Sequence, residues 1–168
     1  MVNGYSFPKE FSAQYTTISY DDLRVKYYDF SGVEHVDGKM IVNKEVALEV
    51  LSIFYELYLN KYAFNKIKLV EEYNASDELS MQDNNTSAFN YRILENGDKL
   101  SWHCFGLAID INPLYNPYIL GNELYPSTAS KYVDRTKNFI GKIDYNDLAY
   151  KTFIKYGWKW GGDFVYSK

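Results

Sequence analysis

SWHCFGLAIDIN, residues 101–112, is the stretch of this sequence that says most about its fold. Its second half alternates apolar and other side chains from Gly106 to Asn112, which predicts a strand that Pro113 closes. On one face of this strand, three residues would enter the core: Leu107, Ile109 and Ile111. The opposite face would carry Asp110 between a small residue and an amide, which is typical of a site rather than of a core.

His103 and Asp110 are the residues of this stretch that could perform chemistry. Gly106 lets the chain turn between them, so that the imidazole can approach the carboxylate. Such a pair supplies two of the three protein ligands of a catalytic zinc, whose fourth position holds water. By spacing alone, a hydrogen-bonded structural pair is the more common case, so a metal site needs support from the rest of the chain.

The remaining chain predicts helices beside a small antiparallel sheet. Apolar residues recur at helical spacing over residues 44–60, where Asn43 can cap the helix, and a second helix is expected over 144–156 before Gly157. Other segments are expected to form strands at 66–72, 88–94 and 158–160, a polar loop at 74–87, and an irregular arm at 1–42 with a turn at Asp37-Gly38. This order of elements predicts an α+β fold in one domain over residues 1–168.

Composition and charge exclude several classes of protein. The chain has 168 residues, of which 46% are hydrophobic and 24% charged, as in an ordinary globular domain. Its net charge of −4 and its lack of a basic run argue against nucleic acid as a partner. Cys104 is the single cysteine, so neither an internal disulfide nor a multi-cysteine zinc site is expected. No stretch is apolar enough to span a membrane, and residues 1–10 lack the apolar segment of a signal peptide.

Several motifs, in order along the chain, resemble one family of enzymes. The pattern S-x-H-x-x-G-x-A-x-D at residues 101–110 resembles the metal motif of the zinc D-Ala-D-Ala carboxypeptidase and L-Ala-D-Glu endopeptidase family. Further runs resemble the same family: DNNTSAFNYR at 83–92, IDINPLYNPY at 109–118 and GWKWGG at 157–162. The resemblance extends over about residues 15–168 and implies the family's fold, which the Hedgehog signalling domain also resembles.

Carried over residue by residue, the resemblance implies a zinc cofactor held by His103 and Asp110. It also implies a substrate contact from Ser101, and it makes Trp160 a second candidate substrate contact. Arg92 is a candidate for stabilising the oxyanion of a tetrahedral intermediate. An arginine engaged in a surface salt bridge is the alternative reading of Arg92.

One part of the family's pattern lies outside this sequence. Relatives complete the metal site with an acidic-x-x-His segment after the glycine pair, which supplies the third ligand and the general base, and no histidine follows His103 here. His35 resembles a structural histidine of relatives, and Asp163 lies where relatives accept many residues. We therefore expect a C-terminally shortened form, with a natural inactive relative as the alternative. Zinc should bind this form weakly, and its peptidase activity should be small until the segment is restored.

These observations predict a metallopeptidase that hydrolyses peptidoglycan stem peptides or muropeptides through metal-activated water. The alternative is a non-catalytic cell-wall or ligand-binding module on the same fold, as in Hedgehog. The family implies work in the cell envelope or outside the cell, and we expect a monomer. Cys104 is expected to be a small packing residue, because adjacent residues of an extended segment point to opposite sides, which disfavours a catalytic dyad with His103.

Overall fold

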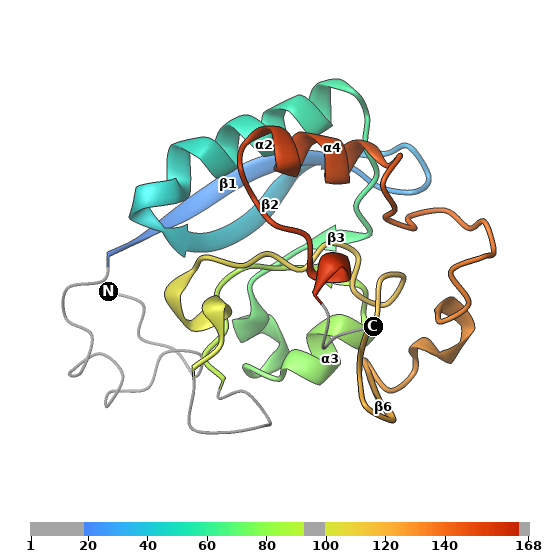
Figure 1. The fold of residues 1–168 in the computed structure, drawn as a ribbon. Helices are drawn as coiled ribbons and strands as arrows, with labels where there is room; N and C mark the ends of the chain where they lie inside the picture. The colour runs from blue at the N-terminus through green and yellow to red at the C-terminus, as the bar shows by residue number, and fades with distance from the viewer. Residues whose placement is uncertain (1–18, 93–99, 165–168) are drawn as a thin grey trace.

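The computed structural model describes residues 19–92 and 100–164 and has an α+β fold (Figure 1). Its longest described strands, β1 (Tyr20–Tyr28) and β2 (Glu34–Asn43), pair as an antiparallel hairpin. The helix α2 (Ala47–Leu59) packs beside β1, and α4 (Leu148–Lys155) packs against α2. The α+β class predicted from the sequence is thereby confirmed.

The hairpin shows that the prediction of an irregular arm over residues 1–42 was wrong from residue 20 onward; residues 1–18 lie outside the described part of the chain. One face of β1 enters the core, through Leu23, Val25 and Tyr27. The hairpin turns at residues 29–33, where the Asp29 side chain accepts two backbone hydrogen bonds. The turn predicted at Asp37-Gly38 was also wrong, because both residues belong to β2.

The helices expected at residues 44–60 and 144–156 are both present. The first begins as a short 3-10 helix, η1 (Lys44–Val46), and continues as α2, and the Asn43 side chain caps it by accepting a backbone hydrogen bond. On its inner face, α2 buries Val50, Ile53, Phe54 and Leu57. The second helix, α4, is capped by Asp147, and the chain leaves it at Gly157 with a φ of +87°.

The other strands are shorter than predicted or absent. β3 (Lys66–Ile67) pairs in parallel with β4 (Asn85–Thr86), and a 3-10 helix, η2 (Val70–Tyr73), follows β3. Residues 88–92 and 158–160 form no strand, and residues 93–94 lie outside the described part. The predicted polar loop at 74–87 contains a helix, α3 (Asp77–Gln82). Residues 106–112 contain only an isolated bridge, which joins Asp110 to Ser87.

Side-chain amides take the place of the missing strand pairing. The Asn85 side chain bonds both the N–H and the C=O of Lys68, and the Asn112 side chain bonds the N–H of Asn65 and the C=O of Ala63. Both asparagines are fully buried, and they satisfy backbone groups that a neighbouring strand would otherwise bind. Asn112, which was expected on the face of the site, therefore lies in the interior.

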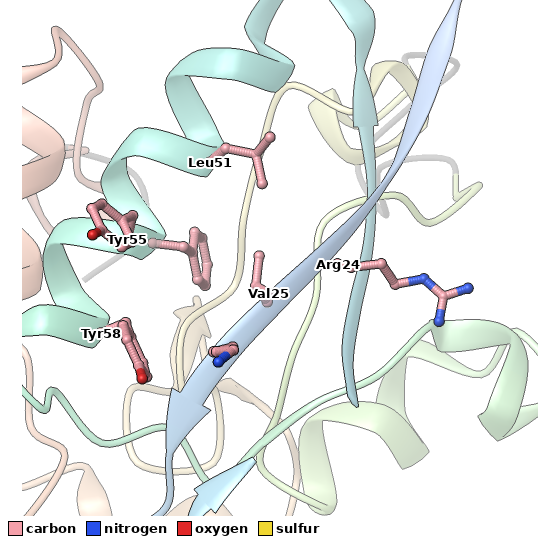
Figure 2. A pocket seen from close by; sticks show the side chains of 7 residues that line it. Arg24, Val25, Leu51, Tyr55 and Tyr58 are labelled. Atoms are coloured by element: carbon pink, nitrogen blue, oxygen red, sulfur yellow. The ribbon is translucent and has the colours of Figure 1, made fainter. Parts of the chain in front are cut away.

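The C-terminal half wraps around this core with little regular structure. A small hairpin joins β5 (Tyr118–Leu120) to β6 (Glu123–Tyr125), a 3-10 helix η4 (Ala129–Tyr132) follows, and η5 (Gly161–Asp163) lies near the end. A pocket of about 320 Å³ opens between β1 and α2, where Val25 lies opposite Leu51 (Figure 2); no candidate site residue lines it. Within the described ranges, none of the helices has the length and apolar character needed to cross a membrane.

Candidate metal site and its surroundings

His103 lies in a short 3-10 helix, η3 (Trp102–Phe105), and not in an extended segment. The Ser101 side chain caps this helix by accepting a hydrogen bond from the N–H of His103 at 3.3 Å. Gly106 ends the helix with a φ of +65°, a left-handed conformation that glycine adopts without strain. The turn expected at Gly106 is thus present, and it directs the imidazole into the protein, where His103 is 7% exposed.

A pair of backbone hydrogen bonds brings Asp110 to His103. The N–H of Asp110 donates to the C=O of Ser87 at 2.9 Å, and the N–H of Ser87 donates to the C=O of Asp110 at 3.1 Å. Oδ2 of Asp110 then lies 3.3 Å from Nε2 of His103. The structure therefore brings together the two residues that the sequence proposed as metal ligands, through one bridge instead of a regular strand.

The second nitrogen of the His103 ring decides how the imidazole can be used. Nδ1 lies 2.6 Å from the carbonyl oxygen of Ala88. A carbonyl oxygen can only accept, so Nδ1 carries the proton, and in the neutral ring Nε2 presents a lone pair to the Asp110 carboxylate. Two acceptors that face each other need a cation or a second ring proton between them. Zinc, which neutral imidazole and carboxylate both bind, fits these donor atoms.

Asp110 is ionised at physiological pH. Burial by itself raises the pKa of its carboxyl group, but the charge and hydrogen bond of His103 when its ring is protonated, together with the charge of Arg92, outweigh burial and hold the pKa below its usual range. A metal ion binds the ionised form of a carboxyl group. Asp110 is therefore available as an anionic ligand near neutral pH.

Arg92 lies close enough to act at the same site. Nη1 of its guanidinium group forms an ion pair with Asp77, and Nη2 lies 3.8 Å from Oδ2 of Asp110. Arg92 belongs to irregular chain and not to the strand expected there. The salt bridge considered as the alternative for this residue is thus present, and a role at the oxyanion stays a prediction.

Asp77 and Asn90 are neighbours of this site that the sequence analysis missed. Asp77 is the first residue of α3, and its Oδ1 accepts a hydrogen bond from the side-chain amide of Asn90 at 2.9 Å. Asn90 also donates its backbone N–H to the C=O of His103. A signal for α3 was available in Ser76, whose side chain accepts from the N–H of Leu79 as a helix cap followed by acidic residues does.

Cys104 is fully buried, as a packing residue should be, and it also holds the backbone of Arg92. Its Sγ accepts a hydrogen bond from the N–H of Arg92 at 3.1 Å and donates to the C=O of the same residue at 3.0 Å. Burial raises the pKa of the thiol, and the nearby hydrogen bonds and charge that lower it do not compensate. The thiolate, which is the reactive form, is therefore disfavoured.

We expect Cys104 to be almost unreactive in the native protein. A chromogenic disulfide reagent at pH 8 should label it at least about tenfold more slowly than in concentrated urea, because labelling requires both a thiolate and access to it. The measurement is the rate of colour release with and without urea, with free cysteine as the reference thiol. Equal rates in the two conditions would show that the sulfur is open to solvent.

The remaining candidate residues have other surroundings. Trp160, a predicted substrate contact, packs edge-on against Tyr145, whose hydroxyl donates a hydrogen bond to Asp163. His35 stacks on a tyrosine of β1 and bonds to the turn of the β1–β2 hairpin, which suits the structural role expected of it. Ser101 is 4% exposed and serves as a helix cap. The substrate contacts predicted for Ser101 and Trp160 stay predictions.

Two side chains form the candidate ligand set in this structure. Across residues 19–92 and 100–164, no group of three or more His, Cys, Asp or Glu side chains lies in an arrangement that could hold a metal ion. His103 and Asp110 are therefore the two candidate metal ligands within the described part of the chain.

Comparison with known proteins bears on the same region of the chain. A family model described as D-alanyl-D-alanine carboxypeptidase matches residues 95–168. The matched part contains Ser101, His103 and Asp110, whereas Arg92 precedes it. No curated protein and no solved structure matched the chain. The match covers less than half of the chain, and it agrees with the motifs around His103 in making residues 95–168 similar to this family of peptidases.

Proposed function

We propose that the chain is a zinc-dependent peptidase that hydrolyses peptidoglycan stem peptides, as a D-Ala-D-Ala carboxypeptidase or an L-Ala-D-Glu endopeptidase. The observation that carries this proposal is the approach of Nε2 of His103 to Oδ2 of Asp110 at 3.3 Å, with Nδ1 of the ring bonded to a carbonyl oxygen. The family match supports peptidase chemistry. The zinc and the substrate class are our inference from the donor atoms and from the resemblance.

In this proposal each residue has a separate task. A bound zinc would polarise the scissile carbonyl and lower the pKa of a water molecule to roughly 7. His103 and Asp110 would hold the ion, and the Ala88 carbonyl would keep the imidazole in the tautomer that offers Nε2. Arg92, with one nitrogen 3.8 Å from Asp110, would place a positive charge where the oxyanion develops. Ser101, which precedes His103 directly, would lie at the edge of the substrate site.

Two measurements test this function. Zinc content should be measured after dialysis against excess zinc and again after a chelator, and release of D-Ala or of stem-peptide fragments should be followed from purified muropeptides. In a form to which the acidic-x-x-His segment of relatives is added, hydrolysis that depends on zinc and stops with the chelator is the expected result, whereas the 168-residue form should show little. Cleavage that survives the chelator would contradict the metal mechanism. Tight binding of muropeptides without cleavage would instead favour the non-catalytic cell-wall module.

The substrate also suggests where and in what form the protein works. Peptidoglycan lies in the cell envelope, so we propose that the protein acts there or outside the cell. We further propose a single domain over residues 1–168, because the described core cluster unites β1, β2, α2 and α4. We also propose that the protein is a monomer. Size-exclusion chromatography with light scattering, at several concentrations, tests the monomer directly.

A further inference from the structure

Asp77 makes two contacts that lead toward the candidate metal site. One is the ion pair with Nη1 of Arg92, and the other is the hydrogen bond that Nδ2 of Asn90 donates to its Oδ1 at 2.9 Å. The Asp77 side chain is 23% exposed and that of Arg92 is 30% exposed, so both charges are partly withdrawn from water. A salt bridge in such surroundings is stronger and more directional than one at the surface.

Arg92 stands between two carboxylates. Its Nη1 is engaged by Asp77, while its Nη2 lies 3.8 Å from Oδ2 of Asp110, which is longer than a direct hydrogen bond. Without Asp77, Nη1 would lose its ion-pair partner, and the guanidinium group would be free to rotate away from its position beside Asp110. Asp77 therefore keeps Arg92 near Asp110 without closing that contact.

The position of Asp77 at the start of α3 does not by itself explain these contacts. Glu78 shares the first turn of the helix, where any acidic residue interacts favourably with the helix dipole. The Glu78 carboxylate, however, accepts hydrogen bonds from Ser127 and Gln82, away from Arg92. Comparing variants of Asp77 with variants of Glu78 therefore separates a general effect of negative charge at the start of α3 from a specific effect on Arg92.

We propose that Asp77 is a positioning residue for Arg92, and that Asn90 in turn orients Asp77. In this arrangement Asp77 holds the guanidinium group so that Nη2 is directed toward the His103–Asp110 pair, where the oxyanion of the reaction would develop. The proposal rests on the proposed function for the reaction it serves, but the contact itself can be tested without any reaction. Its effect should fall on the transition state and not on the binding of zinc or of ground-state substrate.

The first test observes the Arg92 side chain directly. In nitrogen-15 NMR spectra of the wild-type protein, the guanidinium group of Arg92 should show restricted rotation, because it is held at Nη1. Asp77→Ala should release it to the fast rotation of a free arginine, whereas Glu78→Ala should leave it restricted. Asp77→Asn, which keeps one acceptor oxygen, should give an intermediate result and covers the case in which the alanine variant folds poorly.

The second test uses a phosphinate analogue of D-Ala-D-Ala, whose anionic oxygens resemble the tetrahedral intermediate. Asp77→Ala should weaken its binding to the zinc-loaded protein by about 10- to 100-fold, the usual cost of losing a residue that orients a catalytic group. Zinc affinity should stay at the wild-type level. When the Asp77→Ala change is added to Arg92→Lys, it should cost little more, because Asp77 acts through Arg92.

The outcomes of these tests separate the two proposals. Unchanged Arg92 rotation and unchanged phosphinate binding in Asp77→Ala would overturn the positioning role. Equal losses in Asp77→Ala and Glu78→Ala would also overturn it, since they would indicate a general effect on α3. If the wild-type protein does not bind the phosphinate while Arg92 is still released only by the Asp77 variants, the contact is supported and the peptidase function is not.

Discussion

Replacing Asp110 by alanine should lower zinc affinity at the candidate site by at least about 100-fold, and in a form to which the acidic-x-x-His segment is added it should abolish zinc-dependent hydrolysis. Mutation of residues that merely support a ligand typically costs 10- to 100-fold in affinity, and the loss of a charged ligand should exceed that. Oδ2 of Asp110 lies 3.3 Å from Nε2 of His103, so a single metal ion could contact both atoms. The measurement is a competition titration of zinc against a chelator of known affinity.

A matched variant distinguishes this effect from general damage to the protein. Asp83→Asn removes another partly buried carboxylate, which pairs with Lys66 and accepts a hydrogen bond from Tyr73 at 2.7 Å. It should lower stability while leaving zinc affinity unchanged, because none of its partners belongs to the candidate site. Equal zinc affinity in the wild-type protein and Asp110→Ala would contradict the ligand assignment.

Replacing Gly106 by alanine should destabilise the protein by about 3 kcal/mol or more. A non-glycine residue in the left-handed region costs about 1–2 kcal/mol, and overpacking of a close contact costs a further 1–3 kcal/mol. Both costs apply here, since Gly106 has a φ of +65° and an added Cβ would lie 2.4 Å from the backbone N of Asn43 and 2.8 Å from the backbone C of Val42. Urea unfolding monitored by tryptophan fluorescence measures the loss.

The Gly106→Ala change should weaken zinc binding as well as stability. Gly106 ends the helix that carries His103, and its C=O accepts a hydrogen bond from the N–H of Asn43 at 3.0 Å. A shift that relieves the clash would move η3 away from β2, so the folded fraction of Gly106→Ala should also bind zinc more weakly. His103 would then lie at a different distance from Asp110.

Gly121→Ala is the matched control for this variant. Gly121 has a similar φ of +60°, but nothing lies within 4 Å of the position that its Cβ would occupy. It should cost only the conformational term, about 1–2 kcal/mol, with unchanged zinc binding. Equal destabilisation by the two variants would show that the backbone of β2 can move away from an added Cβ at Gly106 with little loss of stability.

Much of the local structure could be predicted because its causes lie in neighbouring residues. The spacing of apolar residues over 44–60 and the cap at Asn43 predicted the first helix, and the glycine at 106 predicted the turn after His103. The hairpin of β1 and β2 was missed although β1 alternates buried and exposed residues. Its turn at Asp29 lies eight residues before the Asp37-Gly38 pair, where the sequence predicts the turn.

The strands expected between residues 66 and 112 are short or absent for a different reason. Asn85 and Asn112 bond backbone groups with their side chains, and this replaces the pairing of strands that alternation predicts. A buried asparagine of this kind cannot be distinguished from a loop residue by its neighbours. Which backbone groups such an asparagine bonds depends on the distant segment that packs against it, and only the tertiary structure shows that segment.

The sequence by itself determined the candidate ligands, His103 and Asp110, and the turn that lets them approach each other. The tertiary structure alone decided what surrounds them: the Ala88 carbonyl that sets the tautomer of His103, and the Asp77 carboxylate that holds Arg92. The ligands lie seven positions apart and share one motif, whereas Ala88 and Asp77 lie 15 positions from the residues they contact. Contacts across such distances depend on how the elements pack, which no local pattern of side chains records.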